Sequence, residues 1–87
     1  ALAFPCSGEI NSTVTDPVAL LSAVEERYAD RSLVIERLDG LGMEFDEWRF
    51  NLRLSNTEPV VRLNVESRGD EALMTAKTEE LLALISA

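Results

Sequence analysis

The sequence predicts an α+β domain in which an antiparallel four-stranded sheet carries two helices on one face. Residues 48–54 and 60–66 alternate apolar with polar side chains, as strands with one buried face do. Residues 17–29 and 71–85 repeat apolar side chains every three or four positions, which is the spacing of an amphipathic helix. The elements follow in the order strand, helix, three strands, helix, an order that favours the α+β class over a parallel sheet.

Both helices have recognisable starts. Residues 8–14 are predicted to form a short first strand or an extended entry to the domain. Asp16-Pro17 then marks a helix start, because aspartate caps well and proline fits the first helical position. Asp70 caps the final helix in the same way. The side chains expected to face the core are Leu20, Leu21, Val24 and Tyr28 in the first helix, and Leu73, Met74, Leu81, Leu84 and Ile85 in the second.

The middle of the chain should supply the other strands. Residues 33–38 form the predicted second strand, followed by a turn at Asp39-Gly40-Leu41-Gly42. Residues 43–46 begin the third strand, which we expect to continue after a kink through residues 48–54. Residues 60–66 form the fourth. Pairing of the last two strands would gather polar side chains on one side of the sheet, where Glu66 would balance an arginine: Arg49, Asn51, Arg53, Arg62, Asn64 and Glu66.

The loop between the last two strands is the strongest candidate for a binding site. Arg53 offers a planar fork of donors that matches phosphate oxygens. Ser55, Asn56 and Thr57 add side-chain donors and a turn whose backbone N–H groups can converge on an anion, while Pro59 restricts the loop. The alternative is ordinary turn chemistry, because serine, asparagine and threonine are common in turns.

The distribution of charge favours a small anion as the ligand. The chain has 16 acidic and 8 basic residues, a net charge of −8. Residues 49–68 nevertheless hold four arginines against two glutamates, which makes this segment +2 and the remainder −10. A local positive island in an acidic chain indicates a specific anion rather than nucleic acid, whose binders usually present a broad basic face.

Other residues limit the class of protein. The chain contains no histidine and one cysteine, Cys6, which argues against a Cys/His zinc site and against histidine-dependent catalysis. A lone thiol fits a reducing cytoplasm. No apolar run approaches membrane-spanning length, so we expect no membrane partner. Residues 1–6 lack the features of a signal peptide and an initiator methionine, from which we expect a fragment that follows another domain.

The segment from Trp48 to Arg68, with Arg53-Leu54-Ser55-Asn56-Thr57 at its centre, resembles the C-terminal, fourth domain of bacterial phosphomannomutases of the α-D-phosphohexomutase superfamily. Residues 4–11 resemble the segment that opens that domain, so the similarity spans nearly the whole chain. The resemblance implies the fold of phosphoglucomutase C-terminal domains, which is similar to that of the TATA-box-binding protein. It divides the chain into a linker, residues 1–8, and a phosphate-binding domain, residues 9–87.

The resemblance also implies a function. Enzymes of this superfamily interconvert mannose 6-phosphate and mannose 1-phosphate, and in some members glucose phosphates, through a hexose 1,6-bisphosphate. The fourth domain holds the phosphate that is not transferred. By this match the phosphate ligands are Arg53, Ser55, Asn56 and Thr57, with Arg49 and Arg62 as candidates for support. No catalytic or metal-ligating residue is expected in this chain, because the phosphoserine and Mg²⁺ belong to the other three domains, which are its expected partners beside the phosphosugar.

A bisphosphate that must turn around needs a site that opens and closes, which predicts a hinge. Gly8 tolerates backbone rotation and Pro5 stiffens the approach, so we place the hinge at Cys6, Ser7 and Gly8. An ordinary linker without a tuned role is the alternative. For the whole chain, the alternative is a non-enzymatic acidic domain that binds a protein through its sheet, although this alternative leaves the concentrated arginines unexplained.

Overall fold

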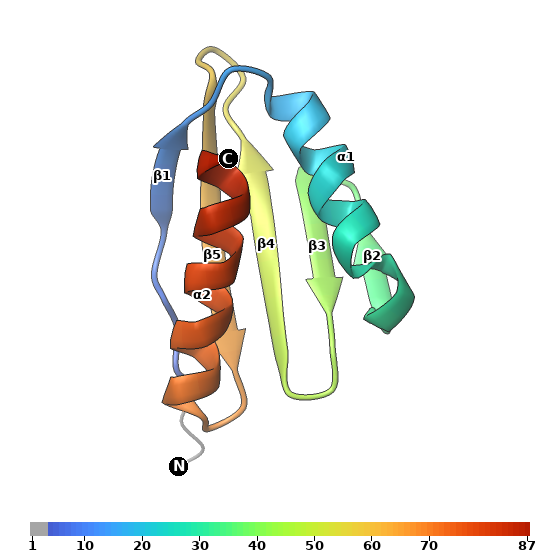
Figure 1. Cartoon of the computed structure of the whole chain (residues 1–87), viewed down its shortest axis with the longest axis vertical. Helices are drawn as coiled ribbons and strands as arrows, with labels where there is room; N and C mark the ends of the chain where they lie inside the picture. Colours follow the sequence, from blue (N-terminus) through green and yellow to red (C-terminus); the bar gives the residue numbers. More distant parts are fainter. Residues whose placement is uncertain (1–3) are drawn as a thin grey trace.

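The structure is a computed structural model that describes residues 4–87. Its elements are β1 (Ile10–Thr13), α1 (Pro17–Tyr28), a 3₁₀ turn (Ala29–Arg31), β2 (Val34–Glu36), β3 (Gly40–Glu44), β4 (Trp48–Leu54), β5 (Val60–Ser67) and α2 (Glu71–Ser86). The strands form one antiparallel sheet in the order β1-β5-β4-β3-β2. Both helices lie on the same face of this sheet (Figure 1). The α+β class and the one-sided helix layer are therefore confirmed.

The sheet has five strands where the sequence predicted four. β3 and β4 are two strands of a hairpin rather than one kinked strand, and the N–H of Phe45 closes their turn on the carbonyl of Trp48 at 2.8 Å. The predicted turn at residues 39–42 was wrong, because Gly40 and Gly42 lie inside β3. Gly40 has φ +130°, and a Cβ there would lie 2.3 Å from the carbonyl oxygen of Leu52. The glycine permits a close approach between strands, a role that a sequence cannot separate from turn formation.

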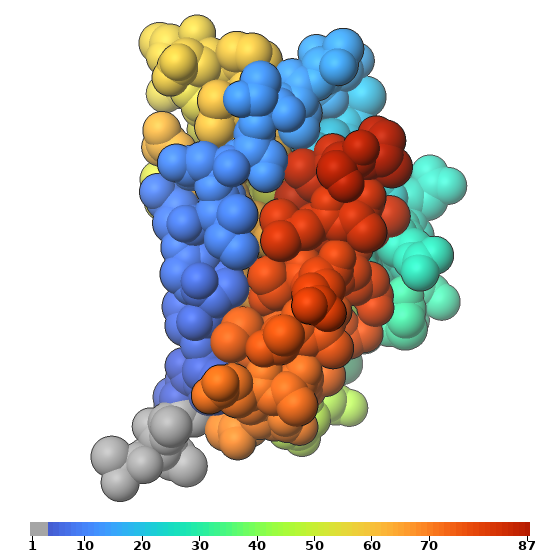
Figure 2. Space-filling view, turned by 60° about the vertical axis from the view of Figure 1, so that its left-hand side comes forward, coloured from blue at the N-terminus to red at the C-terminus, as the bar shows by residue number. Residues whose placement is uncertain are grey.

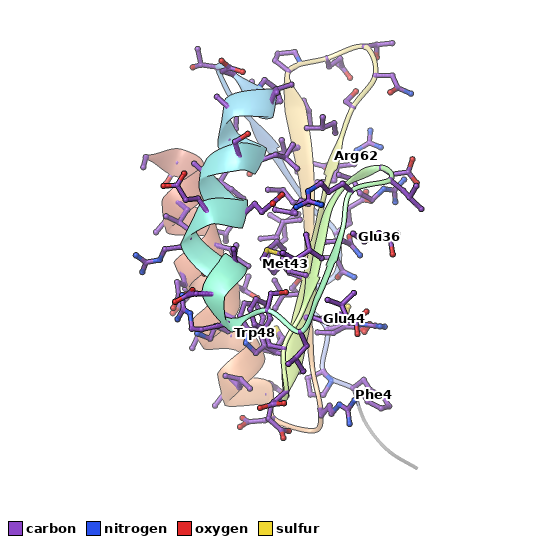
Figure 3. All side chains as sticks on the ribbon, turned by 90° about the vertical axis from the view of Figure 1, so that its right-hand side faces the viewer. Phe4, Glu36, Met43, Glu44, Trp48 and Arg62 are labelled. Atoms are coloured by element: carbon purple, nitrogen blue, oxygen red, sulfur yellow. The ribbon has the colours of Figure 1, made fainter. Side chains whose placement is uncertain are left out.

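Alternation along β4 and β5 builds the core as predicted. The apolar residues of these strands are buried against the helices: Trp48, Phe50, Leu52, Val61, Leu63 and Val65. From the helices, Val24, Tyr28, Leu81 and Ile85 are buried, and the other predicted stripe residues pack around them half-buried. Each large side chain buried in this way contributes roughly 1.5–3 kcal/mol to stability. Figure 3 shows Met43 and Trp48 on the helix side of the sheet and Glu36 and Glu44 on the other.

Tyr28 connects the two helices. Its ring meets those of Phe45 and Trp48 edge-on, with centroids 5.7 Å away in each case. Its hydroxyl donates to Glu80 on α2 at 2.5 Å. Burial, followed by this hydrogen bond, raises the pKa of Tyr28, and the same hydrogen bond lowers the pKa of Glu80. Because the pKa of Glu80 is lower in the folded chain than in the unfolded chain, this contact stabilises the fold fully at pH values above the ordinary glutamate pKa. The stabilisation is lost as the pH falls from there through the lowered pKa of Glu80.

The predicted helix starts are also confirmed. Asp16 accepts a hydrogen bond from the N–H of Ala19 at 3.1 Å, and Pro17 occupies the first turn of α1. Asp70 accepts from the N–H of Leu73 at 3.0 Å in α2. Each such cap is worth about 1 kcal/mol, because it satisfies a helical N–H that would otherwise lack a partner.

Gly40→Ala should destabilise the fold. The new methyl group would meet the Leu52 carbonyl at 2.3 Å and the Cα of Arg53 at 3.0 Å, with the backbone held at a positive φ. We expect the free energy of unfolding to fall by about 2 kcal/mol or more, measured by urea denaturation.

The matched control is Gly42→Ala, two residues along the same strand. Its Cβ would meet nothing closer than 3.8 Å. Stability should change by less than about 1 kcal/mol in this control. Equal effects of the two substitutions would mean that the approach of β3 to β4 at Gly40 is not tight.

Candidate functional site

The predicted site lies at one end of the β4–β5 hairpin. The register runs over seven pairs, from Trp48 opposite Ser67 to Leu54 opposite Val61. Residues 55–59 then join the strands. This continuous pairing places every second side chain on the face away from the helices, so Arg53 and Arg62 stand directly opposite each other next to the loop.

Ser55 organises the loop. Its N–H donates to the carbonyl of Val60 at 3.1 Å, which closes the loop onto β5. Its Oγ accepts from the N–H groups of Thr57 at 3.4 Å and Glu58 at 3.3 Å. Two backbone donors thus already converge on one oxygen, and these long hydrogen bonds are weak enough to be exchanged for an incoming acceptor.

The tip of the loop is open to solvent. Asn56 and Thr57 are exposed, and within residues 4–87 their side chains make no hydrogen bond. The C-terminal end of the loop is attached to the segment that follows β1, because the N–H of Val14 donates to the carbonyl of Pro59 at 2.8 Å. The loop consequently lies beside the connection from β1 to α1 (Figure 1) and projects at the end of the molecule (Figure 2). Arg53 lies near the end of β4, and Ser55, Asn56 and Thr57 follow it in the loop. Their role as phosphate ligands stays a prediction.

Arg53 and Arg62 have no acidic partner in the part of the chain that the structure describes. Their cross-strand neighbours in the same row are Gly40 on β3 and Asn11 on β1, so no carboxylate flanks the pair in the sheet. Within the described residues neither arginine forms a salt bridge. Arg53 is exposed, but the Nε of the half-buried Arg62 is shielded from solvent and has no hydrogen-bond partner. An unsatisfied buried donor costs about 1–3 kcal/mol, and like charges directly opposite each other add to the cost.

Arg49 has a different environment. It lies opposite Glu66, and its guanidinium donates two hydrogen bonds to Oε2 of that carboxylate, at 3.2 Å from Nε and 3.0 Å from Nη2. Glu66 therefore balances an arginine as expected. The ion pair lies toward the opposite end of the hairpin from the loop, and the structure does not bring Arg49 to the predicted ligands.

Sequence reasoning missed the depression beside Arg53. It lies on the helix-free face, where Gly40 and Gly42 contribute no side chain, and its polar lining comes from Glu36, Asp39, Asn51 and Arg53. Two glycines at alternate positions are the signal that could have revealed it, because such glycines leave one face of a strand bare.

The proposed hinge residues lie along the edge of β5. The N–H of Ser7 donates to the carbonyl of Val65 at 2.8 Å, and its hydroxyl accepts from the N–H of Val65 at 2.9 Å. Cys6 forms an isolated bridge with Glu66 and donates its thiol to Asn64. Gly8 follows at φ +73° with open space around it. The hinge stays a prediction, and rotation N-terminal to Gly8 would first break these contacts. Residues 1–3 of the predicted linker lie outside the described part of the chain.

Across residues 4–87, no group of three or more histidine, cysteine, aspartate or glutamate side chains could hold a metal ion. Neither helix in that range has the length and apolar character needed to cross a lipid bilayer. At the loop end of the β4–β5 hairpin, the described residues offer guanidinium, hydroxyl and amide groups that can donate hydrogen bonds to an anion.

Comparison with known proteins identifies the same family that the motif resembles. Residues 9–83 match the family described as phosphoglucomutase/phosphomannomutase, C-terminal domain. The chain is 60% identical over 84 residues, 97% of its length, to a protein named phosphomannomutase from Salmonella typhimurium. It is 51% identical over 82 residues to a protein named phosphohexose mutases from Xanthomonas campestris, and 43% identical over 83 residues to a phosphomannomutase from Methanocaldococcus jannaschii. The chain spans 18% of the length of each relative.

Ser55→Ala should loosen the loop without unfolding the domain. The substitution removes the oxygen that accepts from Thr57 and Glu58. We expect faster hydrogen exchange at these two amides and a change in global stability of less than about 1 kcal/mol. Ser86→Ala, which removes an exposed hydroxyl near the end of α2, is the control. Unchanged exchange at Thr57 and Glu58 would contradict the organising role of Ser55.

Proposed function

Because the chain belongs to the family of phosphoglucomutase and phosphomannomutase C-terminal domains, we propose that it holds the non-transferred phosphate of a hexose phosphate in a mutase. The observation that carries this proposal is a set of donors around the β4–β5 loop that have no partner among residues 4–87: Arg53 forms no salt bridge there, and the side chains of Asn56 and Thr57 form no hydrogen bond. Phosphate is the small anion that best suits a guanidinium fork beside hydroxyl and amide donors.

Each ligand has a separate task in this proposal. Arg53 supplies charge and, through two parallel N–H groups, fixes the orientation of the phosphate. The Ser55 hydroxyl turns toward the anion, which frees the N–H groups of Thr57 and Glu58 to donate to it as well. Asn56 and Thr57 close over the phosphate from the tip of the loop. None of these groups takes part in bond making, so the contribution to catalysis is positioning.

The reaction we propose for the complete enzyme interconverts mannose 6-phosphate and mannose 1-phosphate through a hexose 1,6-bisphosphate, with glucose phosphates as further substrates. The names of the relatives, phosphomannomutase and phosphohexose mutases, support this assignment. A phosphate held away from the reacting bond acts as a handle, because its binding energy can orient the other end of the sugar. The phosphoserine and the Mg²⁺ would belong to other domains of the enzyme, which works in the cytoplasm in this proposal.

The isolated chain should bind hexose phosphates weakly at the loop. On addition of mannose 6-phosphate, the amide resonances of Arg53, Ser55, Asn56 and Thr57 should shift before any others. The dissociation constant should be on the order of millimolar, because most contacts to the sugar are missing. Unphosphorylated mannose is the control and should leave the loop unchanged. Shifts centred on α1 and α2, with a silent loop, would count against the phosphate site.

Turnover can be tested in a chimera that carries this chain in place of the matching 84 residues of the Salmonella phosphomannomutase. The chimera should be active on mannose 1-phosphate. Arg53→Lys in it keeps the charge but loses the two-pronged geometry, and should cost about 1–3 kcal/mol of transition-state stabilisation, seen as a lower kcat/KM. Arg68→Lys, on an exposed arginine at the other end of the hairpin, should not change kcat/KM. If Arg53→Lys were equally silent, Arg53 would have only a structural role.

A further inference from the structure

We propose that Pro59 and Val14 are positioning residues that hold the C-terminal arm of the β4–β5 loop, residues 58–60, in the conformation that binds phosphate. The inference rests on the proposed function and adds to it two residues that do not touch the anion. It predicts that the loop is largely formed before the phosphate arrives, because a proline turn and a backbone hydrogen bond to a neighbouring segment fix the arm.

Pro59 lies at the centre of a three-residue turn. The N–H of Val60 donates to the carbonyl of Glu58 at 2.8 Å, and a hydrogen bond that spans two residues in this way defines a γ-turn. The proline ring confines φ to about −65°, close to the roughly −75° of the inverse γ-turn. Proline therefore favours the conformation of the arm in advance. The turn follows Thr57 directly and includes Glu58, whose N–H groups are the proposed backbone donors to the anion.

The arm is also attached to β1. Pairing of β1 with β5 runs as far as Thr13 opposite Val60. The N–H of Val14 extends this pairing by one step, because it donates to the carbonyl of Pro59 at 2.8 Å. β4 reaches Val60 through the N–H of Ser55 at 3.1 Å, so β1 holds the loop one residue further out than β4 does.

The segment that supplies this hydrogen bond is itself fixed. The side chain of Val14 is half-buried and packs against the core. Two residues later, Asp16 caps α1 by accepting from the N–H of Ala19. The connection from β1 to α1 is thus held at both ends, and Figure 1 shows it beside the loop. Because the donor belongs to a fixed segment, the hydrogen bond from Val14 restrains the arm that carries Pro59.

The tip of the loop depends on this restraint. Within residues 4–87 the side chains of Asn56 and Thr57 make no hydrogen bond, so Ser55 on one side and Pro59 on the other order the tip. Ordering a flexible segment costs free energy at the moment of binding, and a loop fixed beforehand avoids that cost. Loss of Pro59 should therefore weaken phosphate binding, although Pro59 offers no donor to the anion.

The experiment compares Pro59→Ala and Pro59→Gly with the parent chain by amide-shift titration of mannose 6-phosphate and of inorganic phosphate. Pro59→Ala should raise both dissociation constants about two- to fivefold, and Pro59→Gly should raise them more, because glycine leaves the backbone the most freedom. Without ligand, the amides of Val14, Thr57 and Glu58 should exchange hydrogen faster in these variants. Saturating phosphate should restore much of the protection, because the anion and the proline order the same arm.

The matched control is Pro5→Gly. The carbonyl of Pro5 also holds a neighbouring strand, because it accepts from the N–H of Ser67 at 3.0 Å, at the opposite end of β5 from the loop. This variant loses the same ring and the same kind of restraint. It should change the affinity for phosphate less than twofold, whatever its effect on the melting temperature.

Kinetics separate positioning from a purely structural role. In the chimera described above, Pro59→Gly should raise KM for mannose 1-phosphate by the same factor as the dissociation constant and leave kcat within twofold, because a less ordered loop weakens the binding of substrate and transition state alike. A parent-like affinity in Pro59→Gly, an equal loss of affinity in Pro5→Gly, or a loss confined to kcat would overturn this inference and leave the phosphate site standing. If the parent chain shows no shift of the loop with mannose 6-phosphate, the proposed function falls with it.

Discussion

The alternation of side chains across the β4–β5 hairpin is the constraint on which the rest of the structure depends. Seven consecutive pairs hold the register, and each pair sends its side chains to one face of the sheet or the other. A slip by one residue would bring Arg53 to the core and Leu52 to the open face. Such a slip is unfavourable because it would expose the apolar face of both strands, which includes the buried residues Phe50 and Val65. Core packing therefore fixes the position of the arginines.

The same hairpin combines stabilising and destabilising features. At one end the aromatic rings of Tyr28, Phe45 and Trp48 pack against one another, and Arg49 is neutralised by Glu66. At the other end Arg53 faces Arg62, without a carboxylate in their row. Unfavourable local interactions of this kind are expected where a fold binds a ligand, because residues that suit the ligand need not stabilise the fold.

The sequence was sufficient to predict the parts of the fold that depend on local periodicity. Two kinds of signal have a single interpretation, and both were confirmed. One is the alternation of residues 48–54 and 60–66, which predicts strands, and the other is the pair of helix caps at Asp16 and Asp70. The first part of β3, residues 40–42, was mistaken for a turn because Gly40 suggests either a turn or a close contact between strands, and only the position of the Leu52 carbonyl distinguishes them. Which backbone groups lie opposite Gly40 is known only once the strands have paired in the folded chain.

For the candidate site, the sequence predicted the residues but not their surroundings. The motif predicted Arg53, Ser55, Asn56 and Thr57 as ligands, which stays a prediction, and pairing of the two strands implied that Arg53 lies near Arg62. Which arginines are neutralised could not be read from the sequence, because that depends on which carboxylate lies opposite each of them across the strands. Glu66 faces Arg49, whereas Asn11 and Gly40 flank the other pair. The depression at Gly40 and Gly42 was missed for the same reason.

We propose that the exposed end of the hairpin binds phosphate. A crystal structure of the chain grown with mannose 6-phosphate tests it most directly, because it locates the anion without reference to activity. We expect the phosphate group at the loop, with the Arg53 guanidinium and the Ser55 hydroxyl in hydrogen-bond contact with it. A phosphate bound elsewhere on the domain at full occupancy, with the loop unchanged and Ser55 still accepting from Thr57 and Glu58, would contradict it.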